Sequence, residues 1–388
     1  MKKLASIVIA LSLFLVSVHA TTSQGVDLTP SAKAAILIDY ETGQILYEKN
    51  SSAKLYPASM TKMMSLLLVV EAIHNGKLSW DTEVTASAHA SSMGGSQIFL
   101  ETGEVMTVED LYKASTVASA NDAIVALAEK VGGSEENFAA MMNEKAEQLG
   151  LEQTHFVNAT GLHDDNHYSC AKDMAAIGRA LIQEGQDDIL RFTSTYDDYI
   201  RADTENKFWL VNTNKLIRTY QGMDGLKTGY TTQSMYCITV TAKRDGLRLI
   251  GVAMGEPTRD VRNSEASALL DYGFSTYGYQ IEMEKGTPVT TIKVDNGKPD
   301  EVRLVTKEAI GHIVAKGAQS ALINTEIVLD KKKAPIQAGE TVGRVILHFE
   351  DGTQIGQDLV AEEAIMPLDF IDILLKTWKK LLFSQFTT

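Results

Sequence analysis

A serine is followed by a lysine three positions later at three places in this 388-residue chain, Ser51/Lys54, Ser59/Lys62 and Ser169/Lys172. On a helix such a pair lies on one face, with Cβ atoms about 5–6 Å apart, so an unprotonated amine can take the hydroxyl proton and create a nucleophile without histidine. Ser59 has the most favourable context, because Pro57 precedes it and the apolar segment 60–73 predicts a helix directly after it. We interpret Ser51 as a cap or turn residue and Ser169 as the N-cap of the next helix.

Two further short motifs follow along the chain. The one S-x-N sequence is Ser119-Ala120-Asn121, and the one K-[ST]-G sequence is Lys227-Thr228-Gly229, directly before a predicted pair of strands. Either motif alone is typical of a cap or a turn. Together, in the order S-x-x-K, S-x-N, K-T-G, they indicate the parts of a single serine active site.

The three motifs in this order resemble those of the penicilloyl serine transferases. Nearly the whole chain is similar to the low-molecular-mass penicillin-binding proteins that act as serine D-alanyl-D-alanine carboxypeptidases (peptidase S11 type), most of all to the vegetative and sporulation enzymes of endospore-forming Gram-positive bacteria. The segments that carry this similarity are 36–39, 57–62, 92–96, 158–162, 167–169 and 224–229. Three positions depart from the family pattern: Ala120 stands where glycine is common, Cys170 where a hydroxyl residue is common, and Tyr230 where some relatives carry histidine.

The resemblance implies a fold and a reaction. The fold is α+β, an antiparallel sheet with helical layers (the penicillin-binding and β-lactamase-like transpeptidase fold), followed by a small all-β domain and an amphipathic C-terminal helix. In the implied reaction, Ser59 attacks the carbonyl between the last two D-alanines of a peptidoglycan stem pentapeptide, and neutral Lys62 is the general base. Ser119 and Lys227 relay the proton to the leaving amine, while Asn121 holds Lys62 and the peptide amide.

The resemblance also implies how the substrate is held. The backbone N–H groups of Ser59 and Tyr230 form the oxyanion hole. Thr228 and Arg262 are the candidates for the terminal carboxylate, which arginine binds bidentately. The expected substrate-binding residues are Lys227, Thr228, Gly229 and Arg262. Penicillin and other β-lactams are expected covalent inhibitors, and the reaction requires no cofactor and no metal.

Several alternatives share these groups. A class A β-lactamase needs a glutamate in an E-x-x-L-N loop, and the chain contains no Leu-Asn dipeptide. A D,D-endopeptidase or a weak transpeptidase uses the same residues and stays open. A peptidoglycan-binding protein without activity would be expected to lack Ser59 or Lys62, and both are present.

Composition excludes other classes of function. The chain has 36 Lys and Arg against 50 Asp and Glu, a net charge of −14, which argues against nucleic acid as a partner. Two cysteines, Cys170 and Cys237, are too few for a disulfide framework, and one disulfide or two buried thiols are equally compatible with the sequence. His163 and His167 have a spacing that would suit zinc on a helix, but Gly161 and the polar run around them indicate a loop.

The termini predict where the protein works. Residues 1–20 combine a basic start, an apolar run over 4–18 and small residues at positions 18 and 20, which is typical of a cleaved export signal. The tail, 363–388, has apolar residues at helical spacing, namely Leu368, Ile371, Leu375, Trp378 and Leu382, with Lys376, Lys379 and Lys380 beside them. We expect a helix lying on anionic lipid at the outer face of the plasma membrane, with docking on the small domain as the alternative.

Between the termini, the pattern predicts two domains. In the catalytic domain, 21–283, two hairpins are expected at 34–47 and 236–254, and the apolar segments 60–73 and 111–131 are expected to be helices. The hairpins should join in one antiparallel sheet that the helices cover. The small β domain, 284–362, should contain strands at 289–294, 302–305, 327–329 and 342–349.

Overall fold

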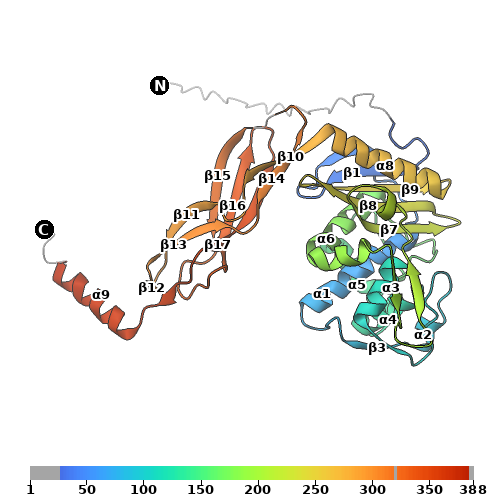
Figure 1. The fold of residues 1–388 in the computed structure, drawn as a ribbon, viewed down its shortest axis with the longest axis horizontal. Helices are drawn as coiled ribbons and strands as arrows, with labels where there is room; N and C mark the ends of the chain where they lie inside the picture. Colours follow the sequence, from blue (N-terminus) through green and yellow to red (C-terminus); the bar gives the residue numbers. More distant parts are fainter. Residues whose placement is uncertain (1–26, 319–320, 384–388) are drawn as a thin grey trace, which may run out of the picture.

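The computed structural model describes residues 27–318 and 321–383. The predicted export signal lies outside the described residues. The chain first builds a larger α+β unit that ends with helix α8, and then a slender β unit that leads to helix α9 at the far end (Figure 1).

The larger unit is organised around one five-stranded antiparallel sheet. Its strand order is β2-β1-β9-β8-β7. The strands are β1 (Ala34–Asp39), β2 (Ile45–Lys49), β7 (Met223–Thr231), β8 (Met235–Arg244) and β9 (Leu247–Glu256). Both predicted hairpins are present, and β1 pairs with β9 so that Ile36 lies opposite Val252. The sheet therefore joins the two ends of this unit.

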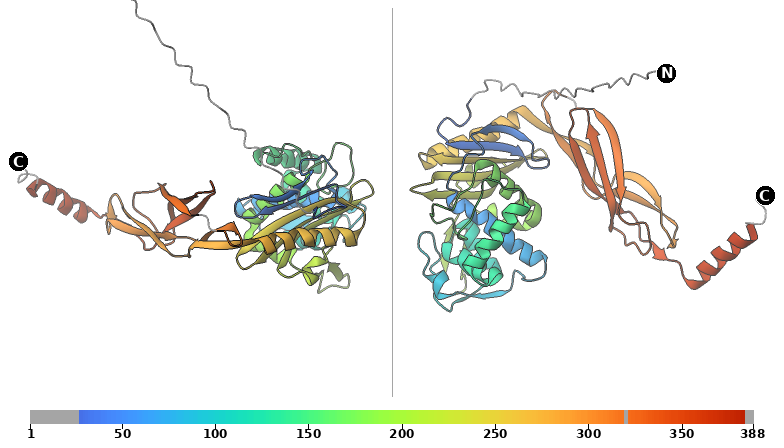
Figure 2. Two further views of the ribbon diagram at one scale, coloured as in Figure 1. Left: turned by 90° about the horizontal axis from the view of Figure 1, so that it is seen from above. Right: turned by 180° about the vertical axis from the view of Figure 1, so that it is seen from behind.

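Helices bury both faces of the sheet. Alternate residues of β1 serve opposite cores: Ile36 and Ile38 pack with the large helical layer, whereas Leu37 packs with Leu269 of α8 (Arg259–Thr276). The large layer contains α1 (Lys62–His74) and α6 (Ala171–Thr193), and the right-hand view of Figure 2 shows the sheet between this layer and α8. Burial on both faces explains why β1 is apolar up to its last residue, since all six of its residues are buried.

The predicted helix over 111–131 is wrong in one respect, because the structure has two helices there. α3 (Val108–Val117) and α4 (Asn121–Gly132) are separated at Ser119, whose φ is +64°. A non-glycine residue in the left-handed region cannot continue a helix. Apolar periodicity runs across the break since both helices face the same core, so it could not locate the break.

Shorter elements complete the larger unit. They are the 3₁₀ turn η1 (Ala58–Thr61), β3 (Glu83–Thr85), α2 (Ala88–Ser91), β4 (Val105–Thr107), α5 (Glu135–Gln148), β5 (Asp197–Ile200), β6 (Phe208–Val211) and α7 (Leu216–Thr219). The N-cap of α6 is Cys170, whose Sγ accepts from the Asp173 N–H at 3.4 Å, so the expectation of Ser169 as the cap is wrong by one residue. Cys170 and Cys237 are both buried free thiols.

The β unit begins with β10 (Tyr277–Met283), which pairs with β14 (Ile310–Ala315). Its main sheet has the order β11-β13-β17-β16-β15 and contains the predicted strands. The strands are β11 (Pro288–Lys293), β13 (Glu301–Thr306), β15 (Leu322–Leu329), β16 (Thr341–Phe349) and β17 (Gln354–Ala361), and the short pair β12 (Gly297–Lys298) and β18 (Met366–Pro367) lies at the end. Leu304, Val345 and Leu359 lie in its core.

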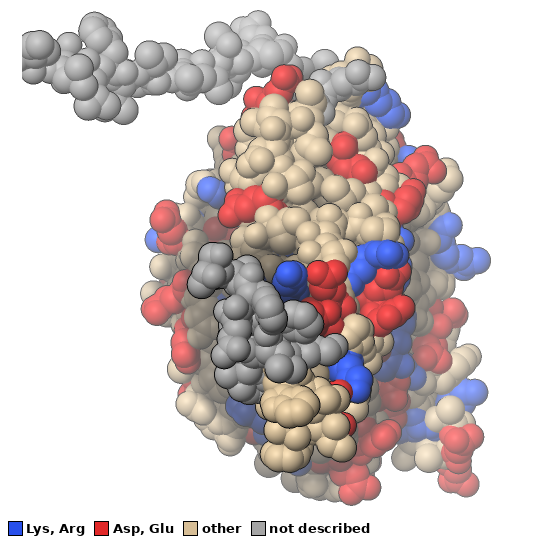
Figure 3. Space-filling model, turned by 90° about the vertical axis from the view of Figure 1, so that its left-hand side faces the viewer, with Lys and Arg blue, Asp and Glu red and all other residues tan. Residues whose placement is uncertain are grey.

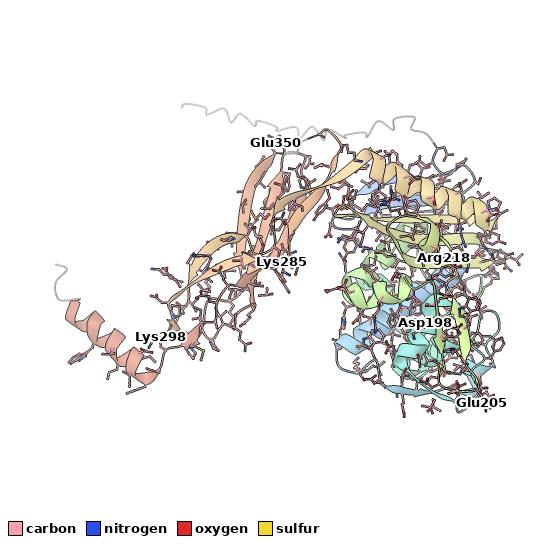
Figure 4. The ribbon with its side chains drawn as sticks, viewed as in Figure 1. Asp198, Glu205, Arg218, Lys285, Lys298 and Glu350 are labelled. Carbon is pink, nitrogen blue, oxygen red and sulfur yellow. The ribbon has the colours of Figure 1, made fainter. Side chains whose placement is uncertain are left out.

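The tail forms α9 (Phe370–Phe383). Phe370, Ile371 and Trp378 are 79%, 64% and 65% exposed, so these side chains do not pack on the β unit. Lys298 lies where the β unit meets α9 (Figure 4), and its ammonium is 2.7 Å from the Asp372 carboxylate. On the side of the molecule that lies at the left of Figure 1, acidic and basic side chains are interspersed among uncharged residues (Figure 3). Within 27–318 and 321–383, no helix combines the length and the apolarity that crossing a bilayer requires.

Candidate active site

Ser59 lies in the 3₁₀ turn η1, and Lys62 is the first residue of α1. The tight turn brings the Lys62 Nζ to 3.2 Å from the Ser59 Oγ. Lys62 is fully buried, whereas Ser59 borders a groove. A hydroxyl that is accessible from the groove therefore lies beside an amine that is buried away from water.

Two oxygens hold the amine of Lys62 on its other sides. The Nζ is 2.7 Å from Oδ1 of Asn121, at the start of α4, and 2.9 Å from the backbone carbonyl oxygen of Thr160. Burial, followed by the positive charge of Lys227, holds the pKa of Lys62 well below its usual value. The neutral form of this amine is therefore favoured relative to that of an ordinary lysine.

Asn121 is itself fixed by the loop that follows α2. Its Nδ2 donates to the Gly94 carbonyl at 2.7 Å, and its backbone N–H donates to the Ser96 carbonyl at 2.6 Å. Gly95 has φ +82°, and a Cβ there would lie 2.9 Å from the Asn121 Nδ2. The loop can approach the asparagine this closely only with glycine at that position.

Of the other two residues expected to move the proton, Ser119 lines the same groove, whereas Lys227 lies buried beneath its lining residue Thr228 and does not line it. Ser119 is almost fully buried at the break between α3 and α4, and its left-handed backbone directs this position to the groove instead of along a helix. Lys227, on β7, is 1% exposed, and its Nζ donates to the Thr228 carbonyl at 3.3 Å. Burial, assisted by the charge of Arg262, lowers the pKa of Lys227 to about 7.

Strand β7 packs against the turn that carries Ser59. A Cβ at Gly229 would lie 2.6 Å from the Pro57 carbonyl oxygen and 3.2 Å from the Ser59 nitrogen. This approach places the backbone of Gly229 and Tyr230 beside the backbone of the nucleophile, as an oxyanion hole made from Ser59 and Tyr230 requires. The Tyr230 ring is half exposed and lies 4.4 Å from the ring of Tyr236.

The groove has a volume of about 420 Å³. Arg262 lines it while only 3% exposed, and its Nε and Nη2 donate to Oδ1 of Asn263 at 3.1 and 2.8 Å. The Thr228 hydroxyl donates to the Thr213 hydroxyl at 2.8 Å. Sequence reasoning missed several lining residues because no motif marks them: Asn212, Thr213, Lys215, Tyr236 and Arg259. Ser96, which also lines the groove, belongs to the segment 92–96 but was not predicted as a site residue.

The other Ser-x-x-Lys pairs and the two histidines serve different purposes. Ser51 Oγ donates to a Glu48 carboxylate oxygen at 2.6 Å, and the Ser169 hydroxyl pairs with the Thr154 hydroxyl at 2.8 Å. His167 is buried with both ring nitrogens hydrogen-bonded, whereas His163 is at the surface. In the part of the chain that the structure describes, no three His, Cys, Asp or Glu residues gather as metal ligands would.

A groove serine beside a buried lysine that an asparagine holds, with a second serine on the same groove and a second buried lysine on β7, is typical of a penicilloyl serine transferase site. Comparison with known families agrees with this class. The peptidase S11 family, D-alanyl-D-alanine carboxypeptidase, matches residues 19–258, and the C-terminal domain of penicillin-binding protein 5 matches residues 281–366. The chain belongs to the peptidase S11 family of D-alanyl-D-alanine carboxypeptidases.

Individual relatives cover most of the chain. D-alanyl-D-alanine carboxypeptidase DacF of Bacillus subtilis is 44% identical over 358 residues, which cover 91% of this chain and 92% of the relative. The structure of penicillin binding protein 5 from Haemophilus influenzae has a TM-score of 0.65 at 32% identity, covering 87% of this chain and 98% of that one. Penicillin-binding protein D2 from Listeria monocytogenes, in the ampicillin bound form, has a TM-score of 0.57 at 34% identity, covering 63% of this chain and 98% of that one.

Proposed function

We propose that this protein is a serine carboxypeptidase that removes the terminal D-alanine from peptidoglycan stem pentapeptides through an acyl-enzyme on Ser59. The observation that carries the proposal is the buried amine of Lys62, 3.2 Å from the Ser59 hydroxyl and with a lowered pKa. A neutral amine has two N–H groups and one lone pair. The Asn121 and Thr160 oxygens accept the two N–H groups, which leaves the lone pair for the Ser59 proton.

The reaction proceeds in two steps. Ser59 Oγ bonds to the penultimate D-alanine carbonyl as its proton passes to Lys62, and the oxyanion lies at the backbone N–H groups of Ser59 and Tyr230. The C–N bond then breaks, and the proton reaches the leaving amine by way of Ser119 and Lys227. Water hydrolyses the ester in the second step and restores the Ser59 hydroxyl.

Recognition of a free C-terminus follows from the charge around the groove. Arg262 presents a guanidinium that is paired with a neutral amide instead of a carboxylate, so its charge is available to a substrate carboxylate. Thr228 and Lys227 lie on β7 beside it, and Arg259 and Lys215 add further positive charge to the rim. A β-lactam presents both a carboxylate and a strained amide to these groups, and the ampicillin-bound relative supports covalent inhibition as part of the proposal.

The experiment combines intact-protein mass with product analysis. The wild type, Ser59→Ala and the matched control Ser51→Ala, which alters another Ser-x-x-Lys pair, are incubated with benzylpenicillin. D-alanine release is then measured from a diacyl-L-Lys-D-Ala-D-Ala peptide. We expect a penicilloyl adduct and D-alanine release in the wild type and in Ser51→Ala, and neither in Ser59→Ala. Absence of both in the wild type would refute the proposal and favour a wall-binding role. A cross-linked muropeptide dimer tests for D,D-endopeptidase activity in the same samples.

Location and domain organisation are further parts of the proposal. Residues 1–20 direct export, 21–283 form the catalytic domain, and 284–362 form a spacer that separates it from the membrane. The tail, 363–388, lies on the outer face of the plasma membrane. The exposed apolar side chains of α9 support this assignment, because water-facing Phe370, Ile371 and Trp378 would enter a lipid interface favourably. Cosedimentation with anionic vesicles should fall strongly in Trp378→Glu, and unchanged cosedimentation would contradict the anchor.

A further inference from the structure

His167 is a buried histidine outside the set of groups that carry out the reaction. It lies in the loop before α6 and is 2% exposed. Its Nε2 is 2.7 Å from the Thr61 hydroxyl oxygen, and its Nδ1 is 3.2 Å from the Val157 backbone nitrogen. The ring therefore connects two segments that are almost a hundred residues apart in the sequence.

The two contacts determine the state of the ring. The Val157 N–H can only donate, so Nδ1 accepts, and Nε2 carries the hydrogen that it donates to Thr61. Burial lowers the pKa of His167 to about 4, so the ring is neutral at neutral pH. The charged or titratable groups that act on it are His155, Asp164, His163 and Lys62. Because both nitrogens are engaged, neither has a lone pair for a metal.

Each of the two segments holds one part of the catalytic lysine. Thr61 ends the turn that carries Ser59 and directly precedes Lys62. Val157 begins the loop that ends at Gly161, and the Thr160 carbonyl of this loop is one of the two acceptors for the Lys62 amine. The loop also contacts the turn directly, since a Cβ at Gly161 would overlap the Ala58 carbonyl.

We propose that His167 is a positioning residue for the reaction. Its neutral ring holds the 157–161 loop against the turn that carries Ser59 and so orients the Lys62 amine toward the serine hydroxyl. Other contacts hold the loop to the helices, such as Ser65 Oγ donating to the Ala159 carbonyl at 2.8 Å. His167 links the loop to the turn, because its ring is hydrogen-bonded to both Val157 and Thr61. The proposal rests on the roles of Ser59 and Lys62 given above.

The test is a double-mutant cycle between His167→Asn and Thr61→Val. Active sites are titrated by intact mass with benzylpenicillin, and the acylation rate constant is measured per titrated site. Each single variant should lose about tenfold in that rate constant, because sub-ångström displacement of a catalytic group has effects of this order. The double variant should lose no more than either single variant, since both remove the same link.

A pH profile distinguishes positioning from a general loss of stability. Loosening the loop admits water to Lys62, which faces Lys227 on β7, Asp122 on α4 and Glu135 on α5. Because burial is the main cause of the lowered pKa of Lys62, hydration raises that pKa, and the acid limb of the acylation profile moves to higher pH.

The matched control is His312→Asn, which removes another fully buried histidine, packed on Phe349 in the β unit. It should lower the melting temperature without changing acylation per titrated site. If His167→Asn behaves in the same way, with a wild-type rate and an unshifted acid limb, the proposal is overturned. If His167→Asn does not fold, the acylation rate constant and pH profile of Thr61→Val test the proposal instead, because this variant keeps the His167 ring and loses only its link to the turn. Failure of the wild type to be acylated would instead refute the function proposed for Ser59.

Discussion

The contact between Gly229 and the turn of Ser59 makes Gly229→Ala the most direct test of the site geometry. The added Cβ would lie 2.6 Å from the Pro57 carbonyl oxygen, where ordinary contact begins at 3.4 Å. Strand and turn must therefore separate by about 0.8 Å, and the atoms on both sides are backbone, which cannot rotate away. A displacement near 1 Å at a reacting centre reduces rates by up to about a hundredfold, equivalent to about 2.7 kcal/mol in the barrier.

The assay is the second-order rate constant for acylation by benzylpenicillin, normalised to titrated active sites. We expect Gly229→Ala to lose between about tenfold and a hundredfold in this rate constant, because the separation would distort the oxyanion hole proposed for the backbone N–H groups of Ser59 and Tyr230. Gly278→Ala is the control, since a Cβ on that β10 glycine meets nothing within 4 Å. A wild-type rate in Gly229→Ala would show that the approach of β7 to the turn is irrelevant to the reaction.

Three further predictions concern the titrating groups. Asn121→Asp places a carboxylate 2.7 Å from the Lys62 amine, which raises the pKa of Lys62, so acylation at pH 7 should fall by more than about tenfold and recover as the pH increases. Lys227 loses its proton as the pH rises through about 7, so kcat should fall along an alkaline limb near that pH. Arg262→Gln removes a neighbouring positive charge, which raises the pKa of Lys227 and should move this limb to higher pH. An unmoved limb would show that Lys227 does not govern it. Burial, together with the neighbouring Glu265, raises the pKa of Glu256 to about 8. Between the ordinary carboxyl pKa and pH 8, the folded protein therefore keeps a proton on Glu256 that the unfolded chain has released. The free energy of unfolding consequently declines as the pH rises toward 8. Glu256→Gln should therefore melt at a higher temperature than the wild type at pH 8.5, with the difference vanishing near pH 4.5, and equal melting at both would contradict the assignment.

Local sequence signals were sufficient for four of the five strands in the sheet of the larger unit, whereas β7, which carries Lys227, was not predicted as a strand. The segments 34–47 and 236–254 consist of strand-forming residues around short turns, and both form hairpins where expected. The break between α3 and α4 was not predictable in the same way. The apolar periodicity continues across Ser119 because both helices bury residues in one core, and only the backbone conformation at Ser119 separates them.

The sequence by itself determined the family, through three short motifs in a fixed order, and it determined the amphipathic tail through helical spacing. Tertiary structure alone decided how the Lys62 amine is held. The partners of that amine are 3, 59 and 98 residues away in the chain, and one of them is a backbone carbonyl that no motif can mark. The charge of Lys62 depends on the exclusion of water and on the proximity of Lys227, and both arise only when distant segments pack together. For the same reason, the ring of His167 was recognisable as a link between the 157–161 loop and the turn that carries Ser59 only once both segments were in place.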